Sequence, residues 1–109
     1  MIDSVKHLNN TVERRIELIK KILSRKGKEY AHGDRLSNFY ATASFLEITP
    51  EKAALNFVTK HIIALRDFIN LLDDGVIERE EQWDEKIGDI INYMIIIDDL
   101  VKRRREEDK

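Results

Sequence analysis

Residues 49–72 read TPEKAALNFVTKHIIALRDFINLL, and this stretch decides the fold. It opens with Thr49 as an N-cap residue, Pro50 at the first helical position and an acid in the first turn, which together predict a helix start. Through 54–72 apolar residues recur at steps of three and four, the spacing of a helix that buries one broad face. The Asp-Asp-Gly sequence at 73–75 predicts the end of this helix.

Two further long helices are predicted on either side of this stretch. The first extends from an N-cap at Asp3 or Ser4 to Gly27, because apolar residues recur at helical spacing and glycine commonly ends a helix. The second runs from about Asp84 into a charged C-terminal tail at about 103–109, which we expect to fray. It is apolar on more than half of its surface, so we expect several neighbours or a second subunit to bury it.

The remaining segments are a short helix over 36–46 and a polar loop over 28–35. The chain of 109 residues has one proline and four glycines, too few for the closely spaced turns of a β-sandwich or barrel. It has no cysteine, which excludes a disulfide scaffold and a thiolate zinc site. The predicted fold is therefore all-α. We expect a single domain, residues 1–109, that forms a compact bundle of three long helices and one short helix and is oligomeric.

Charge is unevenly distributed, although the formal net charge is only -2. Residues 1–28 contain eight basic and three acidic residues, whereas residues 73–99 contain two basic and ten acidic ones. These segments could attract each other within a bundle or an oligomer, or present separate surfaces to different partners. The N-terminus lacks the apolar core of a signal peptide, and the longest apolar run, 94–97, is too short for a membrane span. We therefore expect a soluble, cytoplasmic protein with no membrane partner.

Residues 26–39 concentrate hydrogen-bond donors, an aromatic ring and two carboxylates ahead of a predicted helix. Backbone N–H groups at a helix start, with Lys and Arg nearby, suit an anionic group such as phosphate, and a tyrosine ring could stack on a base. The candidate ligand-binding residues here are Lys26, Lys28, Tyr30, His32, Arg35 and Asn38. The alternative is an ordinary polar loop in which Asp34 caps the following helix.

Lys60, Asp89 and Tyr93 complete the candidate ligand site. Lys60 borders the apolar face of its helix, where it could project into a groove or pair with Asp67. His61 lies on that apolar face, where a histidine is more often a satisfied core residue than a ligand or base. Asp89 lies in the most apolar predicted helix, so it needs either a ligand or a partner such as a buried Lys, Arg or Tyr.

Glu81, Glu85 and Asp89 are spaced four residues apart, so they could line one side of a helix. Carboxylates at this spacing could hold Mg²⁺, with Glu85 and Asp89 as the metal ligands if the protein is a hydrolase. The commoner outcome for such a run is a solvated acidic face. The sequence has no Ser-His-Asp arrangement, Walker loop or dinucleotide fingerprint, so hydrolysis would need a metal.

Four motifs occur in order along the chain: YAHGDRLSNF at 30–39, TPE at 49–51, KHIIALRD at 60–67 and WDEKIGDIINY at 83–93. Together they resemble small, mostly uncharacterised all-α proteins encoded by bacteriophages. The last motif is also similar to the second half of MazG-type all-α nucleotide pyrophosphatases. This resemblance implies a helical, oligomeric protein that handles a nucleotide or its phosphates. The sequence departs from the MazG pattern of paired acids that hold Mg²⁺, because position 86 is lysine and no Glu-x-x-Glu pair lies on a preceding long helix.

Three hypotheses about function follow. In the first, the protein binds a nucleotide or nucleotide-derived signal through the cationic loop and sequesters it without turnover, as a phage counter-defence protein would. In the second, it is a MazG-like Mg²⁺-dependent nucleoside triphosphate pyrophosphohydrolase. In the third, it is an inhibitor that binds a host protein complex through the basic first helix or the acidic stretch at 73–89.

Overall fold

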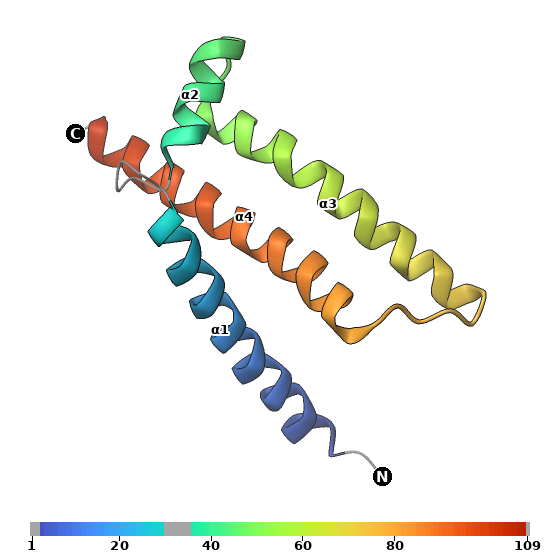
Figure 1. Cartoon of the computed structure of the whole chain (residues 1–109). Coiled ribbons are helices and arrows are strands. Elements are labelled where there is room, and N and C mark those ends of the chain that lie inside the picture. Colours follow the sequence, from blue (N-terminus) through green and yellow to red (C-terminus); the bar gives the residue numbers. More distant parts are fainter. Residues whose placement is uncertain (1–2, 30–35, 109) are drawn as a thin grey trace. The chain divides into compact units, whose positions relative to one another are not determined.

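Residues 3–29 and 36–108 are described by the computed structural model of the protein, with side chains for residues 3–22 and 36–108. They form four helices and no strand: α1 (Ser4–Glu29), α2 (Ser37–Leu46), α3 (Pro50–Asp73) and α4 (Glu80–Glu107) (Figure 1). The predicted all-α class is thereby confirmed. The chain divides into two compact units, residues 1–35 and residues 36–109. No helix in the described ranges combines the length and the apolar composition that a membrane span requires.

The first unit contains α1, which begins where the sequence predicts. The Asp3 carboxylate accepts a hydrogen bond from the backbone N–H of Lys6 at 3.1 Å, the contact of an N-cap residue. The predicted end at Gly27 is wrong, because the helix continues through this residue to Glu29. A single glycine costs a helix only about 1 kcal/mol, and the lysines on both sides of it favour helix.

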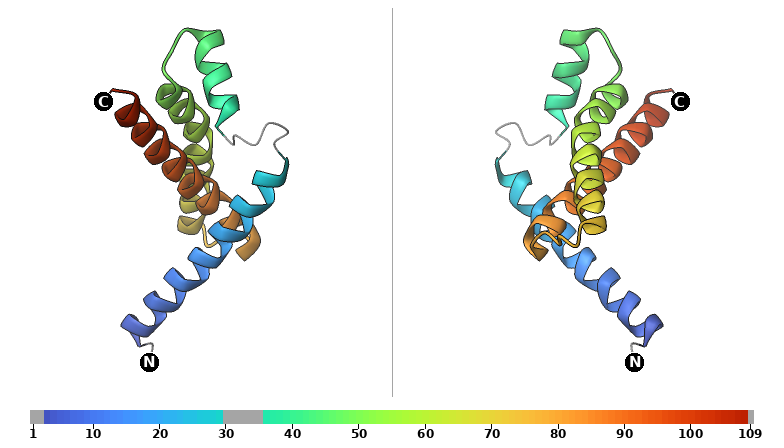
Figure 2. Two further views of the ribbon diagram at one scale, coloured as in Figure 1. Left: turned by 90° about the vertical axis from the view of Figure 1, so that its left-hand side faces the viewer. Right: turned by 90° about the vertical axis from the view of Figure 1, so that its right-hand side faces the viewer.

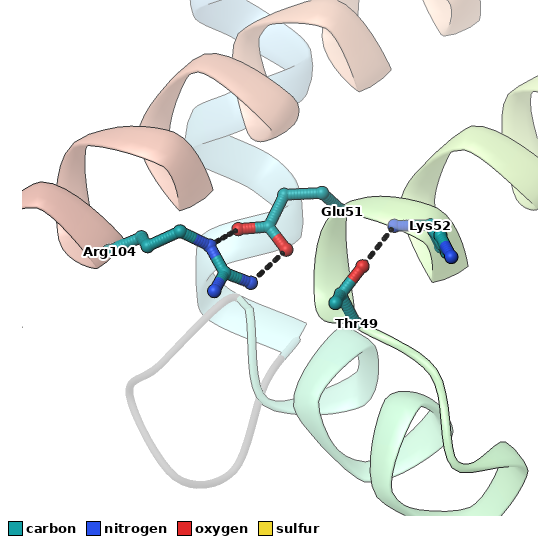
Figure 3. Close-up of polar contacts among 4 residues, drawn as sticks. All are labelled: Thr49, Glu51, Lys52 and Arg104. Carbon is teal, nitrogen blue, oxygen red and sulfur yellow. Dashed lines mark hydrogen bonds and ion pairs between the residues drawn. The ribbon is translucent and has the colours of Figure 1, made fainter.

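In the second unit the predicted start of α3 is confirmed. Glu47 turns the chain out of α2 in the left-handed conformation, with a φ of 58°. The Thr49 hydroxyl then accepts a hydrogen bond from the backbone N–H of Lys52 at 3.2 Å (Figure 3), and Pro50 occupies the first helical position. These contacts satisfy donors that a helix N-terminus otherwise leaves without partners.

α3 and α4 form an antiparallel hairpin and run side by side in Figures 1 and 2. α3 ends at Asp73, and Gly75 turns the chain with a φ of 76°, as the Asp-Asp-Gly sequence predicts. α4 begins at Glu80, four residues before the predicted start, and it continues to Glu107. Acidic residues in its first turn and basic residues in its last turn stabilise both ends by complementing the helix dipole.

Arg104, in the last turn of α4, holds the start of α3 (Figure 3). Its Nε and Nη2 donate hydrogen bonds to the two carboxylate oxygens of Glu51 at 2.8 and 2.7 Å. The hydrogen bonds from Arg104 lower the pKa of the Glu51 carboxyl, and Glu51 in turn raises the pKa of the guanidinium. The prediction of a frayed tail at about 103–109 is wrong for residues 103–107, because α4 continues to Glu107. The contact between Arg104 and Glu51 and the basic residues near the end of the helix dipole both favour helix there.

The core of the second unit is small and joins all three of its helices. Its buried members are Leu36, Phe39, Ala54 and Leu100, and the half-buried residues Tyr40, Phe57, Tyr93, Ile96 and Ile97 pack against them. Phe39 comes from α2, Ala54 from α3 and Leu100 from α4, so one cluster holds the short helix on the hairpin. At the other end of the hairpin, the rings of Phe68 and Trp83 meet edge to face with their centroids 5.5 Å apart.

Candidate functional site

A histidine and a carboxylate meet between α3 and α4. Nδ1 of His61 lies 3.4 Å from Oδ2 of Asp89, and the two side chains are 16% and 20% exposed. The contact is an ion pair when the imidazole is protonated. Asp89, which lies in the apolar helix α4, thus has a partner on α3. That partner is a histidine, whereas the sequence analysis expected Lys, Arg, Tyr or a ligand.

Tyr93 places an aromatic ring beside this pair. The centroids of the His61 and Tyr93 rings are 5.5 Å apart, with an angle of 31° between the ring planes. Tyr93 also stacks on Phe57 at 6.5 Å and meets Phe39 edge to face at 6.1 Å. The polar pair therefore lies next to an aromatic cluster that α2, α3 and α4 build together.

Asn92 is a buried amide next to Asp89. The residue is 6% exposed, and neither its amide nitrogen nor its side-chain oxygen has a hydrogen-bond partner within the described residues. Because the two residues are three apart on α4, they are neighbours on the helix surface. Buried polar groups without partners cost about 1–3 kcal/mol. A ligand that offers both a donor and an acceptor would recover this free energy.

Of the residues predicted to bind a ligand, Asp89 and Tyr93 are brought together around the same histidine. Lys60 and Asn38 are exposed on α3 and α2. Asp67, the alternative partner of Lys60, forms its ion pair with a neighbouring arginine instead. The residues Tyr30, His32 and Arg35 and the side chains of Lys26 and Lys28 lie outside the described residues. The cationic loop therefore stays a prediction.

The acidic series on α4 does not gather into one group. Glu81 and Glu85 are exposed, whereas Asp89 is half-buried against His61. Within residues 3–22 and 36–108, no three His, Cys, Asp or Glu side chains are grouped so that they could hold a metal ion. Ligation of Mg²⁺ by Glu85 and Asp89 stays a prediction.

Sequence reasoning expected His61 to be a satisfied core residue, but it missed the pairing of His61 with Asp89 and the burial of Asn92. His61 and Asp89 could have been matched, because each is a polar residue within the apolar face of its helix and the two helices are consecutive. Polar groups in one apolar interface are generally satisfied by each other. Helical spacing places Asn92 on the same side of α4 as Asp89, but it does not predict that Asn92 is buried, because apolar residues cover so much of the helix that its buried face cannot be identified from the sequence.

The comparisons with known proteins identify no relative. The chain matches no model of a protein family, no curated protein and no solved structure. The similarity to phage proteins and MazG-type enzymes therefore stays a prediction from motifs, and the function is argued from the site alone.

Proposed function

We propose that the protein binds a nucleotide or a nucleotide-derived ligand, and that His61, Asp89 and Tyr93 form the described part of its site. The observation that carries the proposal is a half-buried imidazole–carboxylate pair beside an aromatic ring. Polar groups are costly in an apolar interface unless their hydrogen bonds are complete. Asn92, next to them on α4, lacks partners within the described part of the chain.

The chemistry of these groups fits the base and the sugar of a nucleotide. A carboxylate accepts hydrogen bonds from a base N–H or a ribose hydroxyl, an amide offers both a donor and an acceptor, and an aromatic ring can stack on a base. The exposed Lys60 of α3 offers a cation to the phosphates. The role that we infer is sequestration of the ligand without turnover.

Isothermal titration calorimetry of the full chain with mono-, di- and cyclic nucleotides tests this proposal. Asp89→Asn keeps the shape of the side chain but removes its charge, and it should weaken binding at least about tenfold, because hydrogen bonds to charged groups contribute about 1.5–3 kcal/mol. Asp67→Asn is the matched control, because it removes an exposed carboxylate on α3 and should leave binding unchanged. No heat with any nucleotide, or an equal loss in both variants, would contradict the proposal.

The pyrophosphohydrolase hypothesis predicts a different result in the same samples. A nucleoside triphosphate would then release pyrophosphate in Mg²⁺, and turnover would stop when a chelator is added. Glu85→Gln should abolish this turnover if Glu85 and Asp89 hold the metal. Binding that persists in the chelator without any pyrophosphate supports the sequestration role instead.

The exposed apolar stripe of α1 favours a second candidate function, binding to a host protein. Val5, Leu8, Val12 and Ile16 follow helical spacing and are 72%, 64%, 49% and 44% exposed. Basic residues flank this stripe, and a basic amphipathic helix fits an apolar groove with an acidic rim. Salt-sensitive co-purification of a host protein, lost in Leu8→Glu and retained in Asn10→Glu on another side of the helix, would support this function.

A further inference from the structure

The outer side of α3 carries an apolar row that the described residues of the second unit, 36–108, leave uncovered. Leu55, Ile62 and Ile69 are 54%, 45% and 50% exposed and are spaced seven residues apart. Seven residues make almost two helical turns, so the three side chains form one row about 21 Å long. The row is continuous with the buried face of the helix, because Val58, three residues after Leu55, is fully buried.

A second row with the same spacing runs beside the apolar one. Lys52, Thr59, Arg66 and Asp73 are all exposed, and the last three each follow a member of the apolar row by four residues. This polar row begins with a positive charge and ends with a negative one. In an antiparallel pair of these helices, the positive end of the row on one copy would therefore face the negative end of the row on the other copy, at both ends of the pair.

We infer that a second copy of this chain covers the apolar row, with the two α3 helices antiparallel and a two-fold axis at Ile62. Leu55 then contacts Ile69 of the partner subunit. Lys52 lies ten residues before Ile62 and Asp73 eleven residues after it, which is about 15 Å and about 16.5 Å along the helix. Lys52 therefore faces Asp73 of the partner subunit, and the symmetry forms this ion pair twice.

The other polar groups are compatible with the same register. Arg66 lies opposite Thr59 of the partner subunit, so the polar row places no two like charges opposite each other. Exposed apolar residues also flank both ends of α3, Phe45 (87%) before it and Ile77 (76%) after it. The antiparallel pairing brings these two ends together. This match of the surface to itself favours a second copy over an unrelated partner.

Sedimentation of the full chain over a concentration series tests the pairing. The wild type should show a monomer–dimer equilibrium. Ile62→Glu should raise the dimer dissociation constant at least about 100-fold, because it buries two unpaired carboxylates at the axis. Ile63→Glu is the matched control: Ile63 is 44% exposed, as Ile62 is 45%, but it points away from the row, so its variant should dimerise like the wild type.

The charged ends of the interface give a second, independent readout. Lys52→Asp should weaken the dimer about three- to tenfold, and Lys52→Asp combined with Asp73→Lys should restore it. Helix content and Tm, measured for every variant, show that each one is folded. A wild type that is monomeric at every concentration, or equal effects of Ile62→Glu and Ile63→Glu, would overturn the pairing.

Discussion

Replacement of Asn92 by leucine should stabilise the protein, although it removes a polar side chain from the candidate site. Both polar atoms of Asn92 are buried without a partner among the described residues. Such unsatisfied groups cost about 1–3 kcal/mol, and the change of shape to leucine costs less than about 1.5 kcal/mol. We expect a net gain of roughly 1–2 kcal/mol in the free energy of unfolding, which in a unit of this size raises Tm by roughly 4–16 °C.

Urea unfolding followed by circular dichroism measures this difference, and equal slopes for both proteins show that the same structure unfolds. Asn56→Leu, at an exposed position of α3, is the control, because it reports the gain from helix propensity alone, which is below about 0.7 kcal/mol. Asn92→Leu should also weaken nucleotide binding at least about tenfold if the amide contacts the ligand. A variant less stable than the wild type would refute the reasoning, since it would mean that the amide is satisfied in the folded chain.

Four further substitutions test the packing and the helix ends in the same urea assay. Leu100→Ala should cost about 3 kcal/mol, because Leu100 is 1% exposed in the core, whereas Ile63→Ala, at a position 44% exposed and outside the inferred pairing row, should cost less than about 1 kcal/mol; equal losses would place the core elsewhere. Thr49→Ala should cost about 1 kcal/mol through the lost N-cap, and no loss would mean that water replaces the hydroxyl. Arg104 holds the pKa of Glu51 below its ordinary value of 4.5, so this carboxylate stabilises the fold above that pH, and the stabilisation is lost as the pH falls through the lowered pKa. The difference between the wild type and Glu51→Gln should therefore shrink in acid, and a difference independent of pH would contradict this assignment.

The elements that local chemistry determines could be predicted from the sequence. Thr49, Pro50 and the Asp-Asp-Gly sequence at 73–75 set both ends of α3, because capping and turn formation involve only neighbouring residues. The same reasoning failed at the start and the end of α4. There the helix is extended by charges that complement its dipole and by Glu51, a residue 53 positions away from Arg104.

The candidate site shows the same division. The sequence by itself determined that Asp89 needs a partner and that Tyr93 lies one turn further along, because both follow from the composition and the period of one helix. Only the tertiary structure decided that the partner is His61, that Tyr93 joins the rings of Phe39 and Phe57, and that Asn92 is buried. Helical periodicity tells which side chains share a face. Which faces meet, and in what register, depends on the packing of whole helices against each other, which no local pattern encodes.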